Sequence, residues 1–329
     1  MKFGTKVIHA GVKPDPHTGA IMTPIYQTST YVQDAPGKHK GYEYSRSQNP
    51  TREVLEKNLA AIENGNYGLC FSSGMAAIDA VLKLFKPGDE VIVPSCTHAA
   101  TAEVVRYFNA KPVIVDIERD TQLISISEIK KHITVNTRAV VPVHFAGQPA
   151  DMNEIMAIGS EKNITVIEDA AHAFPAYYKE KPIGSIGDMT CFSFYATKTL
   201  AAGEGGCLTT NNEKWAERLK ILRLHGVSRD AWDRETSKNT WEYDVIAAGY
   251  KYNSTDINSA LGLVQLERST ELWEKRKRIA VFVLFQDHRP RAAGRLDAAG
   301  EVYRQGQPAQ DPGQHLQCPH QPDRRHALL

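Results

Sequence analysis

The sequence predicts an α/β fold built on a mostly parallel, seven-stranded sheet with helices on both faces. Short apolar runs rich in Val, Ile and Phe alternate with stretches of helical periodicity between residues 67 and 210. This alternation is typical of parallel sheets that are buried on both faces, and in such sheets ligands bind beyond the carboxyl ends of the strands. The expected strands are Tyr67–Phe71, Val91–Val93, Pro112–Val115, Ala139–Val143, Ile164–Ile167, Met189–Phe194 and Gly206–Thr209.

Composition limits the partners of the chain. Lys and Arg number 39 against 38 Asp and Glu, and the net charge of +1 gives no summed field that would favour nucleic acid or an anionic membrane. The five cysteines form no Cys-x-x-Cys pair, which favours reduced thiols over disulfides or a zinc site. The N-terminus lacks the apolar core of a signal peptide, and no run approaches the roughly 18 apolar residues of a membrane span. We therefore expect a cytoplasmic protein without a metal site.

Three regions are expected: an extended arm over residues 1–49, a large α/β domain over 50–280 and an atypical tail over 281–329. The arm is polar and rich in Pro and Gly, which predicts a segment that lies against another surface. From Gln286 onward the chain lacks Lys, Ile, Phe and Trp, so it has too few large apolar residues for a folded domain. A disordered natural tail and a translated wrong reading frame both fit this composition.

Two features of the domain carry chemistry. After a helix that begins with Asn49 as its cap and Pro50 at its first position, the next helix opens on a turn containing Ser73, Gly74 and Met75. Such a helix N-terminus offers free backbone N–H groups and a positive dipole end to a phosphate.

The second feature is Lys198, which follows the apolar strand Met189–Phe194 and precedes the glycine-rich turn Gly203–Gly206. An ammonium group in this position loses hydration, so the pKa of Lys198 should fall. Its amine should then be nucleophilic enough to form a Schiff base.

The lysine belongs to a larger pattern. The segments concerned are Pro94–His98, Pro142–Pro149, Glu168–Ala173, Ser193–Gly206 and Gly249–Asn258. Over about residues 94–280 they resemble the DegT-type nucleotide-sugar aminotransferases, which depend on pyridoxal 5′-phosphate. The stretch His225–Arg234 most closely resembles the branch that aminates a UDP-linked 4-keto sugar, as in the formation of 4-amino-4-deoxy-L-arabinose. The family resemblance implies the type I pyridoxal-phosphate transferase fold, with the small C-terminal domain truncated or replaced.

The resemblance implies roles for residues around the cofactor ring. Lys198 would carry the cofactor, Asp169 would keep the pyridine nitrogen protonated, and His172 would contact the 3-oxygen. His98 would stack on the ring.

Further roles concern phosphate groups. Arg229 would meet the substrate diphosphate, although a solvated loop arginine is an equal alternative. The cofactor phosphate would be held by Ser73, Gly74, Met75 and Ser193, together with Asn253 from a neighbouring subunit.

The first part of the chain resembles another family. Over residues 2–93, the segments Thr23–Thr30 and Gly41–Arg52 are similar to those of trans-sulfuration enzymes, the cystathionine synthase and lyase family. In that family the arm crosses to the neighbouring subunit, where Tyr44 and Arg46 would hold the cofactor phosphate. The chain is thus expected to be a composite of two families.

The predicted function is transfer of an amino group from an amino acid, by resemblance glutamate, to a nucleotide-linked keto sugar of polysaccharide biosynthesis. The expected assembly is a homodimer with Arg46 of one chain near Ser73 and Lys198 of the other. The alternatives are a trans-sulfuration enzyme, an inactive composite, and a sugar-binding regulator of the same fold. The sequence names neither the sugar, the nucleotide nor the amino donor.

Overall fold

The computed structural model describes residues 2–35, 38–227 and 244–287. Residues up to Lys277 form one compact unit. Residues 278–287, the described part of a second unit, continue helix α9 (Ser269–Asp287). This helix therefore passes the expected domain boundary at residue 280. No helix within the described ranges is long and apolar enough to cross a membrane.

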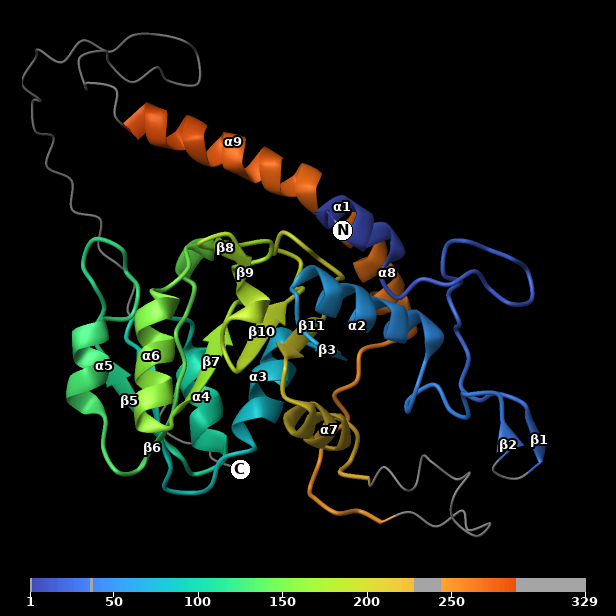
Figure 1. Ribbon diagram of the computed structural model, residues 1–329, viewed down its shortest axis with the longest axis horizontal. Helices are drawn as coiled ribbons and strands as arrows, with labels where there is room; N and C mark the ends of the chain where they lie inside the picture. The colour runs from blue at the N-terminus through green and yellow to red at the C-terminus, as the bar shows by residue number, and fades with distance from the viewer. Residues whose placement is uncertain (1, 36–37, 228–243, 288–329) are drawn as a thin grey trace, which may run out of the picture. The chain divides into compact units, whose positions relative to one another are not determined.

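The central sheet confirms the predicted α/β class (Figure 1). Its strand order is β3-β11-β10-β7-β6-β4-β5. The pairs β4–β5, β4–β6, β6–β7 and β7–β10 are parallel, whereas β11 is antiparallel to both of its neighbours, β10 and β3. All the predicted strands are present, and β6 ends earlier than expected. Their bounds are β3 (Tyr67–Phe71), β4 (Glu90–Pro94), β5 (Lys111–Val115), β6 (Thr137–Val140), β7 (Thr165–Asp169), β10 (Met189–Ser193) and β11 (Gly206–Thr210).

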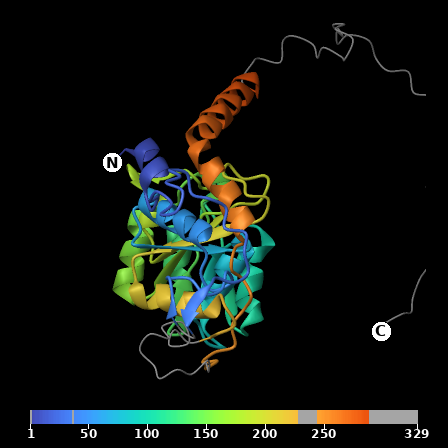
Figure 2. The same ribbon diagram turned by 90° about the vertical axis from the view of Figure 1, so that its right-hand side faces the viewer.

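Helices cover both faces of the sheet, as Figures 1 and 2 show. They are α1 (Phe3–His9), α2 (Pro50–Ile62), α3 (Gly74–Leu82), α4 (Ala99–Tyr107), α5 (Ile126–His132), α6 (Met152–Lys162), α7 (Glu213–Leu222) and α8 (Asp256–Glu267). Successive strand residues point to opposite faces. Leu69 and Leu208 accordingly pack with α3, α4 and α7. Their neighbours Cys70 and Cys207 pack with α1, α2 and α8.

The N-terminal arm differs from the prediction because part of it is helical. Helix α1 docks on α2: Asn58 Nδ2 donates to the Val7 carbonyl at 2.6 Å, and Lys6 Nζ donates to the Ala61 carbonyl at 2.7 Å. Later in the arm, β1 (Gln33–Ala35) and β2 (Lys38–His39) form a short antiparallel pair. The helix escaped prediction because its stabilising contacts are with α2, about 50 residues away in the chain.

The remaining short elements lie in the connections around the strand ends. Antiparallel β8 (Tyr177–Tyr178) and β9 (Lys181–Pro182) follow β7, and the short 3-10 helices are η1 (Phe145–Gly147) and η2 (Ile183–Ser185).

Candidate active site

The carboxyl ends of three strands bring four predicted residues into electrostatic contact. Asp169 ends β7, while His98 and Lys198 follow β4 and β10. His172 lies in the loop after β7 and interacts with the charges of Lys198, Asp169 and His98. The parallel strand order explains the arrangement, because the carboxyl ends of parallel strands lie at the same edge of a sheet.

Asp169 is held in place through both its backbone and its carboxylate. Its backbone N–H donates to the Pro142 carbonyl at 2.9 Å, and its own carbonyl accepts from the His144 N–H at 3.1 Å. Its Oδ1 accepts from the Ala171 N–H at 3.1 Å, and Oδ2 accepts from Thr101 Oγ1 at 2.8 Å. A carboxylate oxygen can accept more than one hydrogen bond, so the group keeps capacity for a further donor.

Lys198 is half-buried in the turn beyond β10. Burial lowers the pKa of Lys198, and the negative charge of Asp169 partly opposes this effect. The turn is fixed from outside, since the Arg276 guanidinium of α9 donates to the carbonyls of Thr197 at 3.0 Å and Lys198 at 3.3 Å. A lowered pKa increases the fraction of neutral amine, the form that acts as a nucleophile or base.

The two histidines flank this pair. His172 is exposed, yet partial burial of its ring lowers the pKa of His172; the charge of Lys198 lowers it further, and Asp169 raises it. His98 caps α4, with its Nδ1 accepting from the Ala100 N–H at 3.2 Å. This bond makes Nδ1 the acceptor, and the residue as a whole is exposed.

Small residues pack closely around the predicted phosphate-binding turn. Ser73 caps α3, and its Oγ accepts from the Ala76 N–H at 3.0 Å. A Cβ at Gly74 would lie 2.7 Å from Ser193 Cβ, and one at Gly206 would lie 2.4 Å from the Ser73 carbonyl oxygen. Only glycine therefore fits at either position. The N–H groups of Gly74 and Met75 begin the helix and have no acceptor within it.

Asn253 lies next to the same turn of its own chain. It pairs with Phe71 across an isolated bridge, and the adjacent Tyr252 carbonyl accepts from the Ser72 N–H at 2.7 Å. The residue is 7% exposed, and its Oδ1 has no hydrogen-bond partner among the described residues. A buried amide oxygen without a donor is costly, so this atom fits a missing ligand or partner group.

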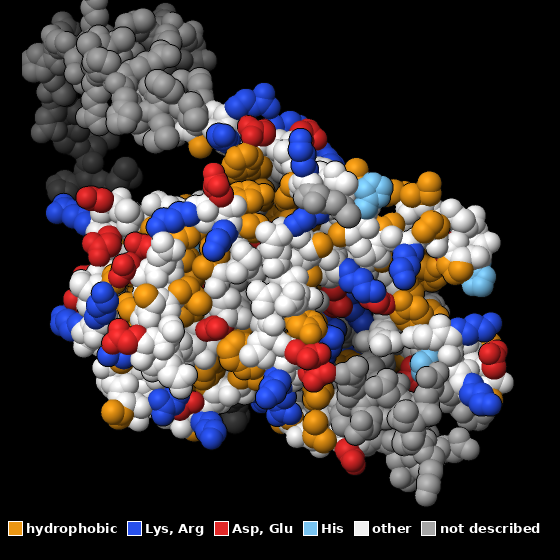
Figure 3. Space-filling model, viewed as in Figure 1, with side chains coloured by type: hydrophobic (Ala, Val, Ile, Leu, Met, Phe, Trp, Pro, Cys, Tyr) orange, Lys and Arg blue, Asp and Glu red, His pale blue; other side chains and the backbone are white. Residues whose placement is uncertain are grey.

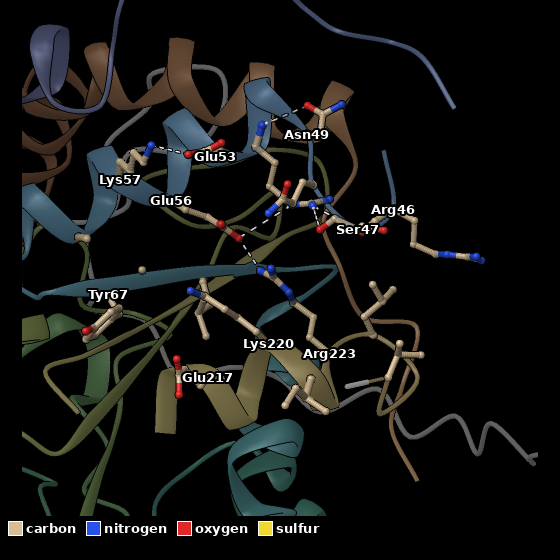
Figure 4. A pocket seen from close by; sticks show the side chains of 18 of the residues that line it. Arg46, Ser47, Asn49, Glu53, Glu56, Lys57, Tyr67, Glu217, Lys220 and Arg223 are labelled. Carbon is tan, nitrogen blue, oxygen red and sulfur yellow. Dashed lines mark hydrogen bonds and ion pairs between the residues drawn. The ribbon is translucent and has the colours of Figure 1, made fainter. Parts of the chain in front are cut away.

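Tyr44 and Arg46 do not lie at this turn of their own chain. Arg46 stacks over the Tyr44 ring with its Cζ 4.9 Å from the centroid. It also lines a pocket of about 450 Å³ between α2, β3 and α7, with Arg52, Glu56 and Arg223 (Figure 4). In Figure 4 the Arg46 side chain extends away from the Glu56–Arg223 pair.

Three other residues, Arg229, Thr101 and His144, also bear on the candidate site. Arg229 lies outside the described residues. Sequence reasoning missed Thr101, although its position one helical turn after His98 was a usable signal. His144, in the predicted segment Pro142–Pro149, is completely buried against Glu168, with 2.9 Å between Nε2 and Oε2. In the parts of the chain that the structure describes, no cluster of His, Cys, Asp and Glu could hold a metal ion.

The residues at this edge have the chemistry for one kind of group. A partly neutral amine, a held carboxylate with spare acceptor capacity and a cradle of backbone N–H groups suit a phosphorylated aldehyde with a basic ring nitrogen. A model of the DegT/DnrJ/EryC1/StrS aminotransferase family matches residues 43–286. The chain belongs to this family.

Individual relatives agree with the family. The chain is 44% identical over 236 residues to the spore coat polysaccharide biosynthesis protein SpsC of Bacillus subtilis, covering 71% of this chain and 61% of SpsC. It is 52% identical over 195 residues to the uncharacterized protein MJ1066 of Methanocaldococcus jannaschii, covering 59% of this chain and 50% of that protein.

Solved structures agree as well. The fold is similar to the pyridoxal-phosphate form of the putative sugar aminotransferase Spr1654 from Streptococcus pneumoniae, with a TM-score of 0.65 and 34% identity over 71% of this chain and 63% of that one. An aminotransferase from Psychrobacter cryohalolentis matches with a TM-score of 0.64 and 32% identity over 67% of this chain and 56% of that one. The expected type I pyridoxal-phosphate transferase fold is thus confirmed. The chain spans less than two thirds of the length of these relatives.

One expected resemblance is not supported. The aminotransferase family model begins at residue 43, so it already includes the Ser73–Met75 turn and the helix before it. Half of the segment assigned to the trans-sulfuration enzymes thus belongs to the same family as the rest of the domain, and no change of family occurs near Pro94.

Proposed function

We propose that the chain is a pyridoxal-5′-phosphate-dependent aminotransferase that moves an amino group from an amino acid, by family resemblance glutamate, to a nucleotide-linked keto sugar. The observation that carries the proposal is the half-buried Lys198, with its pKa lowered by burial, placed within electrostatic reach of the held carboxylate of Asp169. The sugar aminotransferase Spr1654 and the polysaccharide biosynthesis protein SpsC support the substrate class.

The residues present fit the cofactor. The N–H groups of Gly74 and Met75 would hold its phosphate at the start of α3. The Ser193 hydroxyl, whose oxygen accepts from the Tyr195 N–H at 3.4 Å, could donate its proton to the same phosphate. Asp169 would accept a hydrogen bond from the protonated ring nitrogen, and His98 and His172 would lie against the ring. When bound, the cofactor supplies an electron sink for the substrate carbon.

The chain itself moves the proton. Because its pKa is lowered, Lys198 Nζ could act as the base that takes the proton from the amino-acid carbon and, in the second half of the reaction, as the acid that gives a proton to the sugar carbon. The hydrogen bonds from Ala171 and Thr101 would hold the Asp169 carboxylate in place beside the ring nitrogen. Loss of hydration around Lys198 makes this exchange faster than it would be for a solvated lysine.

The test is chemical labelling. The purified protein, incubated with pyridoxal 5′-phosphate and reduced with borohydride, should carry one pyridoxyl group on Lys198 after peptide mapping. A label on another lysine, or an absorbance spectrum without any cofactor band, would overturn the proposal. Turnover with a panel of amino donors and nucleotide keto sugars then identifies both substrates.

The proposed enzyme is a homodimer whose active sites lie at the interface. The arm exposes Ile21 (72%), Met22 (61%) and Val32 (84%), and hydrophobic side chains gather over it in Figure 3. Helix α8 exposes an apolar face through Ile257, Leu261 and Val264. Burial of such surface favours association.

Arg46 is proposed to reach the partner's cofactor phosphate. Within the described ranges it has no carboxylate partner, and its side chain extends outward (Figure 4). Light scattering should give a dimer mass, and Arg46→Cys with Lys198→Cys in separate chains should cross-link across the interface. A monomer, or a dimer without this cross-link, would leave Asn253 as the phosphate ligand beside the turn.

A further inference from the structure

A threonine that the proposed mechanism does not otherwise use lies directly behind the candidate carboxylate. Thr101, on α4, is fully buried at 0% exposure. Its Oγ1 donates to Asp169 Oδ2 at 2.8 Å and lies 2.7 Å from Thr97 Oγ1. A hydroxyl has one proton, and Thr101 gives it to the carboxylate, so Thr97 must be the donor in the second bond. The hydrogen bonds therefore run from Thr97 to Thr101 to Asp169.

We propose that Thr101, supported by Thr97, is a positioning residue that orients the Asp169 carboxylate toward the ring nitrogen of the cofactor. This inference rests on the proposed function. The Ala171 N–H holds Oδ1 at 3.1 Å and Thr101 holds Oδ2, so donors from two different elements fix the plane of the carboxylate. Each oxygen keeps a lone pair for the ring N–H.

The pair of hydroxyls strengthens the contact. A donor that itself accepts a hydrogen bond is polarised, and bonds to an ionised carboxylate are about twice as strong as neutral ones. The site is also dry around Thr101, since that residue is buried, and water cannot replace the lost donor without new space.

The same helical turn carries the predicted ring-stacking residue. The Thr101 N–H donates to the His98 carbonyl at 3.1 Å, so both residues belong to the first turn of α4. A shift of α4 would therefore move the ring face and the carboxylate partner together. The first turn of α4 thus positions both the residue that would stack on the cofactor ring and the hydroxyl that holds the Asp169 carboxylate.

The decisive variants are Thr101→Val, which removes the hydroxyl at nearly constant shape, and Thr101→Ser, which keeps it. We expect Thr101→Val to lower kcat about ten- to a hundredfold, with little change in KM for the amino donor. It should also weaken cofactor affinity of the apoprotein about tenfold. Thr101→Ser should restore both, and Thr97→Val should show a smaller loss.

A matched control separates this role from stability. Thr209 is also buried, and its Oγ1 donates to the Gly184 carbonyl at 3.0 Å, away from Asp169. Thr209→Val should lower the thermal midpoint as much as Thr101→Val but leave kcat and cofactor affinity unchanged.

The outcomes distinguish the two proposals. If Thr101→Val matches the wild type in kcat and cofactor affinity, or if Thr209→Val lowers them equally, the positioning role is wrong. If Thr101→Val does not fold, Thr97→Val decides: unchanged kcat and cofactor affinity in that variant would overturn the role. If the wild type itself binds no cofactor at Lys198, the proposed function fails first, and that result is obtained before any variant is made.

Discussion

Two regions of this protein that carry buried or half-buried charge differ in whether those charges have partners within the chain. At the outer edge of β3, Arg52 and Arg223 are almost fully buried, at 3% and 6% exposure, and Glu56 lies between them. At the carboxyl ends of the strands, Lys198 is half-buried, and no ion pair to it is found among the described residues.

The β3 cluster completes the hydrogen bonding of an edge strand. Glu56 accepts from the Cys70 N–H at 2.9 Å, and Arg223 donates to the Cys70 carbonyl at 2.8 Å. Arg52 donates to the carbonyls of Ser47 at 2.8 Å and Ser254 at 3.3 Å. The cluster has its partners within the protein, whereas Lys198 keeps an amine available to a ligand. A buried charged group whose hydrogen-bond and ion-pair partners all lie within the protein supports the fold. A desolvated charged group without such partners is a candidate for ligand binding or catalysis.

The largest effect should come from Lys198→Ala. This variant removes the amine that carries the cofactor and moves the proton, so turnover should fall by about 10⁴-fold or more. The free energy of unfolding should change little, because the side chain is half-exposed and forms no ion pair with any residue that the structure describes. Lys198→Arg, which keeps the charge, is the control and should be equally inactive. Residual turnover above a hundredth of the wild type in either variant would show that another residue acts.

Asp169→Asn should come next. An amide cannot stabilise the protonated ring nitrogen, so transamination should fall at least about a hundredfold while the cofactor still binds. Steady-state kinetics together with the cofactor absorbance band measures both quantities. Turnover close to that of the wild type would remove Asp169 from its proposed role.

Glu56→Gln tests the other side of the comparison. It leaves two buried guanidinium groups without a carboxylate, and the free energy of unfolding should fall by about 3–5 kcal/mol. Urea denaturation measures the change. The matched control is Glu154→Gln at the exposed pair with Lys130, which should cost less than about 1 kcal/mol. Equal losses in the two variants would show that the β3 cluster is no more important than a surface pair.

The last prediction is a pH dependence and concerns the buried carboxyl of Glu63 at the end of α2. Burial raises the pKa of Glu63 to about 8; the Gly184 N–H opposes this shift and the charge of Glu168 adds to it. The unfolded chain ionises near 4.5, whereas the folded chain keeps the proton up to about pH 8. The unfolded state therefore binds fewer protons in this window, and stability falls as pH rises through it.

Glu63→Gln should remove this dependence. The wild type should lose stability relative to the variant by about 1 kcal/mol per pH unit from about pH 5 to pH 8, after which the difference should level off. Urea titrations at several pH values measure the difference between the two proteins. Parallel profiles would mean that Glu63 is already ionised in the folded state.

Local signals in the sequence determined the elements and the principal site residues. The apolar runs predicted each strand of the sheet, and Asn49 caps α2 as predicted, accepting from Thr51 and Arg52. Lys198 could be chosen because it lies between an apolar strand and a glycine-rich turn, whereas Asp169 could be chosen through the resemblance to the aminotransferase family. These signals are local because periodicity and capping depend on residues a few positions apart.

Tertiary structure alone decided which residues meet. Thr101 and Asp169 are 68 positions apart in the chain, and Arg223 and Cys70 are 153 apart. The strand order places β7 between β10 and β6 and β3 at the edge, and no local pattern encodes that order. The same order explains why Glu56 and Arg223 meet at the edge of β3 and why α1 finds α2 to pack against. Contacts between residues that are far apart in the sequence depend on the topology of the sheet, so only the folded structure reveals them.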